Sequence, residues 1–245
     1  MKSRIGIPEI IYEDNHLLVA VKPAGVLSQA DISGDLDMLT LLKDYLKIKY
    51  NKPGEAYLGL LHRLDRPVYG VMVFAKTSKC ASRVSAQIRN HEVTKLYRAI
   101  VKGFVKPDSD ELHGAILKDE AENKVTVFEQ DEAPEHAKEA RLRYAVTGRV
   151  VEAGLTGQST AGTDLTLLRV ELLTGRSHQI RAQLAFAGFP ILGDRKYDPQ
   201  TKYNGDICLE SYSMTLRHPV TNETMVFELP LRSLRPWGLF ESRVQ

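Results

Sequence analysis

A single carboxylate, Asp65, stands between two arginines in the segment 62–67, which reads His-Arg-Leu-Asp-Arg-Pro. The segment directly precedes an apolar run at 71–75, which predicts a buried strand. Pro67 lacks a backbone N–H and Gly70 tolerates positive φ, so the loop before the strand is expected to bend sharply. A carboxylate with cationic neighbours is either a structural ion-pair partner or a reactive group kept ionised. These residues alone leave both interpretations open.

A second group of cations lies where a helix is predicted to begin. The pattern predicts a helix from His178 to Ala187 with Ser177 as its N-cap. The N-terminus of a helix carries partial positive charge, to which Arg176, His178 and Arg181 would add. Such a site suits a carboxylate or a phosphate. The alternative is a helix end capped by local polar groups, with Arg181 exposed.

Tyr97 belongs to a predicted strand, Leu96 to Lys102, in which apolar and basic residues alternate. It falls on the apolar side of that strand. From the residues alone, it is interpreted as a core tyrosine with one hydrogen bond.

The net charge of +2 conceals an uneven distribution of charge along the chain. Residues 76–106 include eight basic residues and one acid, whereas residues 108–139 include eleven acids and three lysines. This segregation predicts a basic face that meets a polyanion, with phosphate contacts that supply affinity without sequence choice. A solvated helix face followed by an acidic loop is the alternative.

Length and composition fit a globular protein of 245 residues with 43% hydrophobic residues, enough for one large domain or two small ones. No apolar run approaches the roughly 20 residues that a membrane span needs. Cys80 and Cys208 lie far apart and match neither a disulfide framework nor a zinc motif. We therefore expect reduced thiols in a cytoplasmic protein with no membrane association.

Most predicted strands follow one another without crossover helices, which favours an α+β fold with a largely antiparallel sheet. Residues 1–9 are predicted to be an N-terminal tail, and residues 10–245 one domain. A surface loop is predicted from Gly154 to Gly162, which is rich in Gly, Thr and Ser.

Five motifs, taken together in this order, resemble the RluA family of RNA pseudouridine synthases. They are Lys-Pro-Ala-Gly at 22–25, His-Arg-Leu-Asp-Arg-Pro at 62–67, Lys-Leu-Tyr at 95–97, Gly-Arg-Ser-His-Gln-Ile-Arg at 175–181 and Gly-Phe-Pro-Ile-Leu-Gly-Asp-Arg-Lys-Tyr at 188–197. The resemblance runs from about Ile10 to Leu231, and the second and fourth motifs at this spacing are highly specific.

The resemblance implies a single catalytic domain built on a long, mostly antiparallel mixed sheet flanked by helices and loops, with an RNA-binding cleft across the sheet. Asp65 matches the essential aspartate of the family, and Tyr97 the tyrosine that stacks on the target base. Arg181 matches the arginine that pairs with the aspartate, and Arg63 an arginine that helps to extrude the target nucleotide. The other expected RNA contacts are Lys22, Arg66, Lys95, Arg176 and His178.

Isomerising uridine to pseudouridine moves a bond from nitrogen to carbon and oxidises nothing, so no redox cofactor or metal is expected. The expected partner is structured RNA, with ribosomal RNA favoured over transfer RNA, and the family implies a monomer. Tyr69, Gln183 and Glu210 depart from residues that many relatives carry, which bears on subfamily and substrate.

Two other functions stay open. One is an RNA-binding protein on the same fold without activity. The other is a glycosidase-like hydrolase, which needs a second carboxylate at a defined distance from Asp65.

Overall fold

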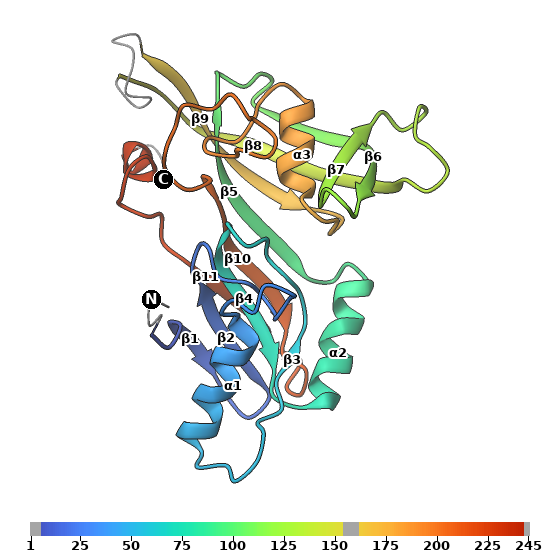
Figure 1. The fold of residues 1–245 in the computed structure, drawn as a ribbon, viewed down its shortest axis with the longest axis vertical. Coiled ribbons are helices and arrows are strands. Elements are labelled where there is room, and N and C mark those ends of the chain that lie inside the picture. The colour runs from blue at the N-terminus through green and yellow to red at the C-terminus, as the bar shows by residue number, and fades with distance from the viewer. Residues whose placement is uncertain (1–5, 154–161, 243–245) are drawn as a thin grey trace. The chain divides into compact units, whose positions relative to one another are not determined.

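The computed structural model describes two stretches of the chain, residues 6–153 and 162–242. Most of the predicted 1–9 tail and of the loop predicted at Gly154–Gly162 lies outside these residues. The described chain forms two compact units (Figure 1). The first unit comprises the described residues up to Lys95 together with Ser211–Leu229, and the second comprises the described residues of Leu96–Glu210 and from Pro230 onward.

The first unit is a mostly antiparallel sheet with two helices. Its elements are β1 (Ile10–Glu13), β2 (Leu17–Lys22), α1 (Met38–Lys49), β3 (Gly59–Leu60), β4 (Tyr69–Ala75), α2 (Ser78–Arg89), most of β10 (Leu209–Arg217) and β11 (Thr224–Glu228). Strand β2 lies between β1 and β4, β3 also pairs with β4, and β11 pairs with β10. Every residue of β2 is buried, because apolar side chains cover both of its faces.

Both helices of the first unit begin at a side-chain cap. The carboxylate of Asp37 accepts the Thr40 N–H at 3.0 Å at the start of α1. The hydroxyl of Thr77 accepts the Cys80 N–H at 3.2 Å at the start of α2. Each cap satisfies a backbone donor that the helix itself leaves without a partner, so each fixes where its helix begins.

The second unit contains five strands in the order β5-β9-β8-β6-β7, with antiparallel neighbours. Its elements are β5 (Thr94–Lys102, mostly in this unit), β6 (Ser109–Asp119), β7 (Lys124–Phe128), β8 (Lys138–Glu152), β9 (Thr163–Leu172), α3 (Gln179–Phe186) and the short 3-10 helix η1 (Trp237–Phe240). Ala182 of α3 packs on β6, β7 and β8 through Ile116, Val125 and Ala140.

The α+β class and the antiparallel pairing are confirmed, whereas two local details differ from expectation. The acidic segment from Asp108 onward contains β6, which the sequence analysis did not predict. Helix α3 begins at Gln179, and its cap position is His178 in a left-handed conformation rather than Ser177. The single catalytic domain over residues 10–245 stays a prediction. Within the described residues, no helix is both long enough and apolar enough to span a membrane.

Candidate active site

Asp65 lies half-buried in the loop that joins β3 to β4, residues 61–68, here called the Asp65 loop. The Val68 N–H donates to the Asp65 carbonyl at 3.0 Å and closes a turn. Gly70 follows at φ +141°, and a Cβ there would stand 2.2 Å from the Ser211 carbonyl oxygen. Only glycine therefore lets β10 come this close to β4. The bend predicted in the loop before the strand is confirmed by this turn, whereas Gly70 lies within β4.

The end of β2 and the turn after it fix Arg66, the residue after Asp65. The Lys22 ammonium donates to the carbonyls of Pro23, Val26 and Arg66 at 3.0, 2.6 and 2.8 Å. The Gly25 N–H donates to the same Arg66 carbonyl at 2.9 Å. Two donors thus converge on one carbonyl next to Asp65, which restricts the backbone there.

Lys22 itself is fully buried, with 0% of its surface exposed. Burial lowers its pKa to about 7, the carboxylate of Asp65 acts in the opposite direction, and Arg66 lowers the pKa further. The sequence analysis expected Lys22 to contact RNA. The structure instead places its ammonium against main-chain carbonyls inside the first unit, because the residues after β2 fold back over the side chain.

His62 fixes the start of the Asp65 loop. Its Nε2 accepts the Val73 N–H from the middle of β4 at 3.0 Å. Burial lowers the pKa of His62 to about 3, and Lys95 contributes to this. The ring is therefore neutral, with its proton on Nδ1. The sequence analysis gave His62 no role, although its place in the second motif was a signal that could have indicated one.

The cations around the Asp65 loop differ in their availability. Arg63 is exposed. Arg66 is also exposed, and its guanidinium donates to the Gly25 carbonyl at 3.0 Å and pairs with Asp35 at 2.8 Å. Lys95 is half-buried, and burial lowers its pKa.

In the second unit, Arg181 on α3 is held by a buried carboxylate. Its Nε and one Nη donate to the two carboxylate oxygens of Asp194, each at 2.8 Å. The guanidinium carbon lies 5.3 Å from the centre of the Tyr197 ring. Arg181 is 6% exposed and Asp194 1% exposed, so the pair is a charge-assisted contact in a dry environment.

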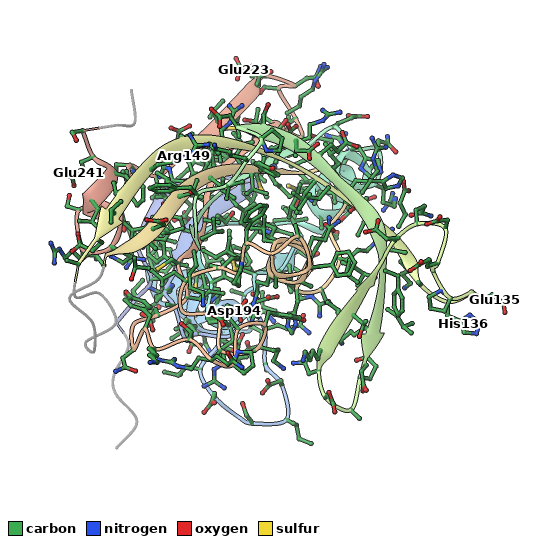
Figure 2. All side chains as sticks on the ribbon, turned by 90° about the horizontal axis from the view of Figure 1, so that it is seen from above. Glu135, His136, Arg149, Asp194, Glu223 and Glu241 are labelled. Carbon is green, nitrogen blue, oxygen red and sulfur yellow. The ribbon has the colours of Figure 1, made fainter. Side chains whose placement is uncertain are left out.

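Asp194, labelled in Figure 2, belongs to one network with Tyr197 in the loop after α3. Asp194 also accepts the Lys196 N–H at 3.2 Å. The Tyr197 hydroxyl accepts the Val125 N–H at 3.0 Å and bonds to Nδ1 of His178 at 2.9 Å. Asp194 and Tyr197 both belong to the motif at 188–197, for which the sequence predicted no role.

The remaining site candidates of the second unit have separate surroundings. Tyr97 on β5 is 7% exposed and lies opposite Val170 of β9 in the register of the sheet. Arg176 is exposed, and its Nε donates to the Glu139 carbonyl at 2.9 Å. Around the start of α3, Arg176 thus bonds to the main chain of β8, whereas His178 and Arg181 both contact Tyr197.

Comparisons with known proteins identify the family. The family model described as RNA pseudouridylate synthase matches residues 16–186. A Haemophilus influenzae protein, "Dual-specificity RNA pseudouridine synthase RluA", is 34% identical over 89% of this chain and 91% of its own length. The chain belongs to the RNA pseudouridylate synthase family.

Other members of the RNA pseudouridylate synthase family are more distant. The Vibrio vulnificus "Ribosomal large subunit pseudouridine synthase C" is 29% identical over 91% of this chain and 65% of its own length. The solved structure "Human RNA Pseudouridylate Synthase Domain Containing 4" has a TM-score of 0.72 at 23% identity, covering 96% of this chain and 92% of that one. The structural likeness supports the fold.

For a family that acts on RNA, the placement of charged residues matters. In this structure, basic and acidic residues are less segregated than the sequence predicts. Three of the eight basic residues in 76–106 form ion pairs with acids from distant parts of the sequence. These pairs are Lys76–Glu13, Arg98–Glu210 and Lys102–Asp198. Lys79, Arg83 and Arg89 on α2 are exposed. The acidic part includes Glu135 and His136 at the tip of the β7–β8 loop (Figure 2).

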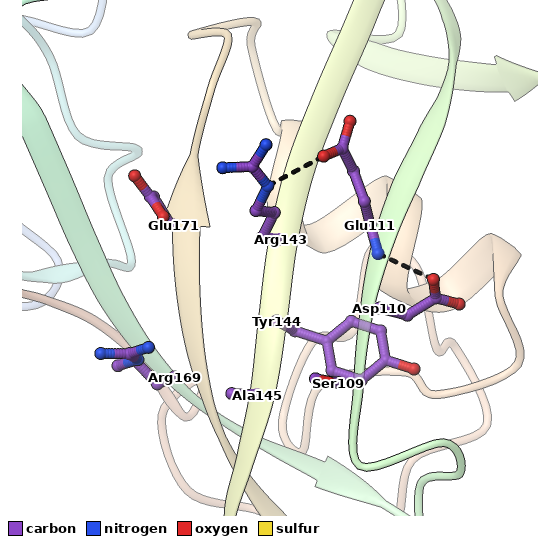
Figure 3. A pocket seen from close by; sticks show the side chains of 8 residues that line it. All are labelled: Ser109, Asp110, Glu111, Arg143, Tyr144, Ala145, Arg169 and Glu171. Carbon is purple, nitrogen blue, oxygen red and sulfur yellow. Dashed lines mark hydrogen bonds and ion pairs between the residues drawn. The ribbon is translucent and has the colours of Figure 1, made fainter.

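A cavity of about 330 Å³ in the second unit contains none of the predicted site residues of this synthase (Figure 3). It is lined by Ser109, Asp110, Glu111, Arg143, Tyr144, Ala145, Arg169 and Glu171. Glu111 pairs with Arg143 at 2.9 Å across this cavity wall. The lining carries both signs of charge, so it gives no preference for a polyanion.

Proposed function

We propose that this chain is an RNA pseudouridine synthase in which Asp65 is the catalytic carboxylate. The family match over residues 16–186 supports the reaction. One structural observation supports the residue: Asp65 is half-buried on a loop whose next carbonyl, that of Arg66, accepts two hydrogen bonds. An aspartate on a loop fixed in this way is suited to a reaction that needs an oriented carboxylate.

The reaction is an isomerisation within one nucleotide. The bond between uracil N1 and sugar C1′ breaks, the uracil turns, and a bond between C5 and C1′ forms. The proton on C5 leaves and N1 becomes protonated, so atoms and electrons balance. Asp65 acts in its ionised form, either as a nucleophile towards the sugar or the base or as the base that removes a proton.

Tyr97 and Arg181 complete the proposed catalytic set. Extruding the target nucleotide from a folded RNA costs a few kcal/mol, and stacking on an aromatic ring returns about 1–3 kcal/mol per base. Tyr97 supplies that ring, and Arg181 supplies the cation that favours the ionised carboxylate. The exposed Arg63 and Arg66 are placed beside Asp65 in sequence to contact the RNA backbone.

Ribosomal RNA is the proposed substrate, supported by relatives whose names specify the large ribosomal subunit. The name of the Haemophilus relative specifies dual specificity, so transfer RNA belongs in the same test. Site-resolved pseudouridine mapping, by carbodiimide treatment and primer extension, compares both RNAs from cells with the wild-type gene, a deletion and an Asp65→Asn allele. Asp44→Asn, an exposed aspartate on α1, is the matched control.

We expect a modification that is present in the wild type and the control, and absent from the deletion and Asp65→Asn. If no position changes while the purified protein binds RNA tightly, it is a binding protein without activity. Release of free uracil would instead indicate a hydrolase.

A further inference from the structure

Ser28 makes two hydrogen bonds to the residue that precedes Asp65. Its hydroxyl donates to the Leu64 carbonyl at 2.7 Å and accepts the Leu64 N–H at 3.0 Å. Ser28 is only 6% exposed and Leu64 likewise 6%, so water does not compete freely for these groups. One side chain thus satisfies both backbone polar groups of Leu64, as a neighbouring strand would.

The residues on both sides of Asp65 are therefore held by the same segment, residues 22–28. Ser28 holds Leu64 on one side, and Lys22 and Gly25 hold the Arg66 carbonyl on the other. With both neighbours fixed, the Asp65 backbone has little freedom, and the side chain starts from a defined Cα position.

Ser28 is itself well anchored. Its neighbour Leu27 accepts the Met38 N–H at 2.8 Å at the start of α1. The Leu27 N–H donates to the Leu36 carbonyl at 3.3 Å. The Asp37 cap fixes the same end of α1. Hydrogen bonds at the adjacent residues Leu27 and Ser28 thus connect the start of α1 to Leu64, the residue before Asp65.

We propose that Ser28 is a positioning residue for the reaction and sets the placement of the Asp65 carboxylate through the Leu64 backbone. The inference rests on the proposed function of Asp65. Without the hydroxyl, both polar groups of Leu64 lose their partner in a buried place, so the loop shifts to satisfy them. A misplacement of about 1 Å can cost on the order of 10²-fold in rate. RNA affinity, which comes from contacts elsewhere, stays the same.

The test compares Ser28→Ala with Ser33→Ala, which removes an exposed serine from the same connection. The substrate is ribosomal and transfer RNA from the deletion strain, labelled with tritium at uracil C5, because that position loses its hydrogen. Single-turnover tritium release measures the chemical step, a filter-binding titration measures the Kd for the RNA, and hydrogen exchange reports on the Leu64 amide.

For Ser28→Ala we expect a release rate at least tenfold below the wild type, a Kd within twofold, and faster exchange at Leu64. Ser33→Ala keeps wild-type values. If Ser28→Ala does not fold, as judged by circular dichroism, Ser28→Cys takes its place, because it keeps the volume with a weaker donor. At least a fivefold lower rate is then expected.

A folded Ser28 variant with a wild-type rate would overturn the inference, as would a loss that lies entirely in Kd. Wild type and Asp65→Asn are measured in the same series. If the wild type releases no tritium from either RNA, the proposed function fails rather than the role of Ser28.

Discussion

Asp65 and Arg181, proposed to act in the same reaction, are held in place by different kinds of interaction. Around Asp65, the partners are main-chain groups: Ser28 bonds to Leu64, and Lys22 bonds to the Arg66 carbonyl. Arg181 is held at its charged end by a buried carboxylate, that of Asp194. These hydrogen bonds position the backbone next to Asp65, whereas the ion pair positions the charged end of Arg181.

This difference determines how each position responds to change. A loop held by several main-chain hydrogen bonds keeps most of them when one is removed. A single substitution there is therefore expected to have a partial effect. In a buried ion pair, removing one member takes a counter-charge away from the other in a dry environment. We therefore expect the region of Arg181 to be the more sensitive in stability, and the Asp65 loop the more sensitive in rate.

The largest expected effect is that of Asp194→Asn. Removing one partner of a buried pair costs about 3–5 kcal/mol, because Arg181 keeps its charge and loses a buried counter-ion. We expect a decrease in the free energy of unfolding of about 3 kcal/mol, measured by urea denaturation at pH 7.5. Asp131→Asn, in the exposed loop after β7, is the control and should change stability little.

The double variant Arg181→Met with Asp194→Leu separates stability from function. Apolar side chains of similar volume can replace a buried ion pair without loss of stability. This variant should regain most of the lost free energy of unfolding and remain inactive in tritium release. A single Asp194→Asn variant as stable as the wild type would show that the pair does not anchor Arg181.

The second largest expected effect is the dependence of the free energy of unfolding on pH, through His62 in the first unit. His62 has a pKa of about 3 in the fold and about 6.5 when unfolded. Between these values the unfolded chain binds a proton that the folded chain does not, so the free energy of unfolding decreases as the pH falls below 6.5. At pH 5.5 this one group accounts for a loss of about 1.4 kcal/mol.

His62→Gln removes that proton and keeps an acceptor for the Val73 N–H. Urea denaturation at pH 7.5 and 5.5 should therefore show a smaller decrease for this variant than for the wild type. His136→Gln, at the exposed tip of the β7–β8 loop, should behave like the wild type. Equal pH dependence in all three proteins would contradict a buried neutral His62.

The sequence predicted features that depend on neighbouring residues, but not contacts between residues that are distant in the chain. The bend in the loop before β4 was predictable, because a glycine and a proline near a strand start carry a local signal. The burial of Lys22 was not, because its acceptors include a carbonyl 44 positions away in the chain. The Arg181–Asp194 pair was missed for a different reason: the resemblance supplied a partner for Arg181, and no second one was sought.

The prediction of strands has the same limit, because it too depends on the local sequence pattern. Alternating apolar and basic residues predicted β5, whereas β6 was hidden because acids such as Asp110 and Glu111 interrupt its apolar pattern. Glu111 pairs with Arg141 and Arg143 of β8, so its charge is satisfied across the sheet. Charge counted along the sequence therefore predicted an acidic region where the fold builds a strand.

The smallest expected effect concerns an exposed ion pair at the surface of the Asp65 loop. Arg66 and Asp35 pair at 2.8 Å, but their side chains are 50% and 49% exposed. Such pairs contribute about 0–1 kcal/mol, because water screens them and two side chains lose freedom. Asp35→Asn should change the free energy of unfolding by less than about 0.5 kcal/mol and leave the single-turnover rate unchanged, at both low and high salt. A rate reduced as far as that of Ser28→Ala would mean that surface charge, and not buried hydrogen bonds to the main chain, holds the Asp65 loop in place.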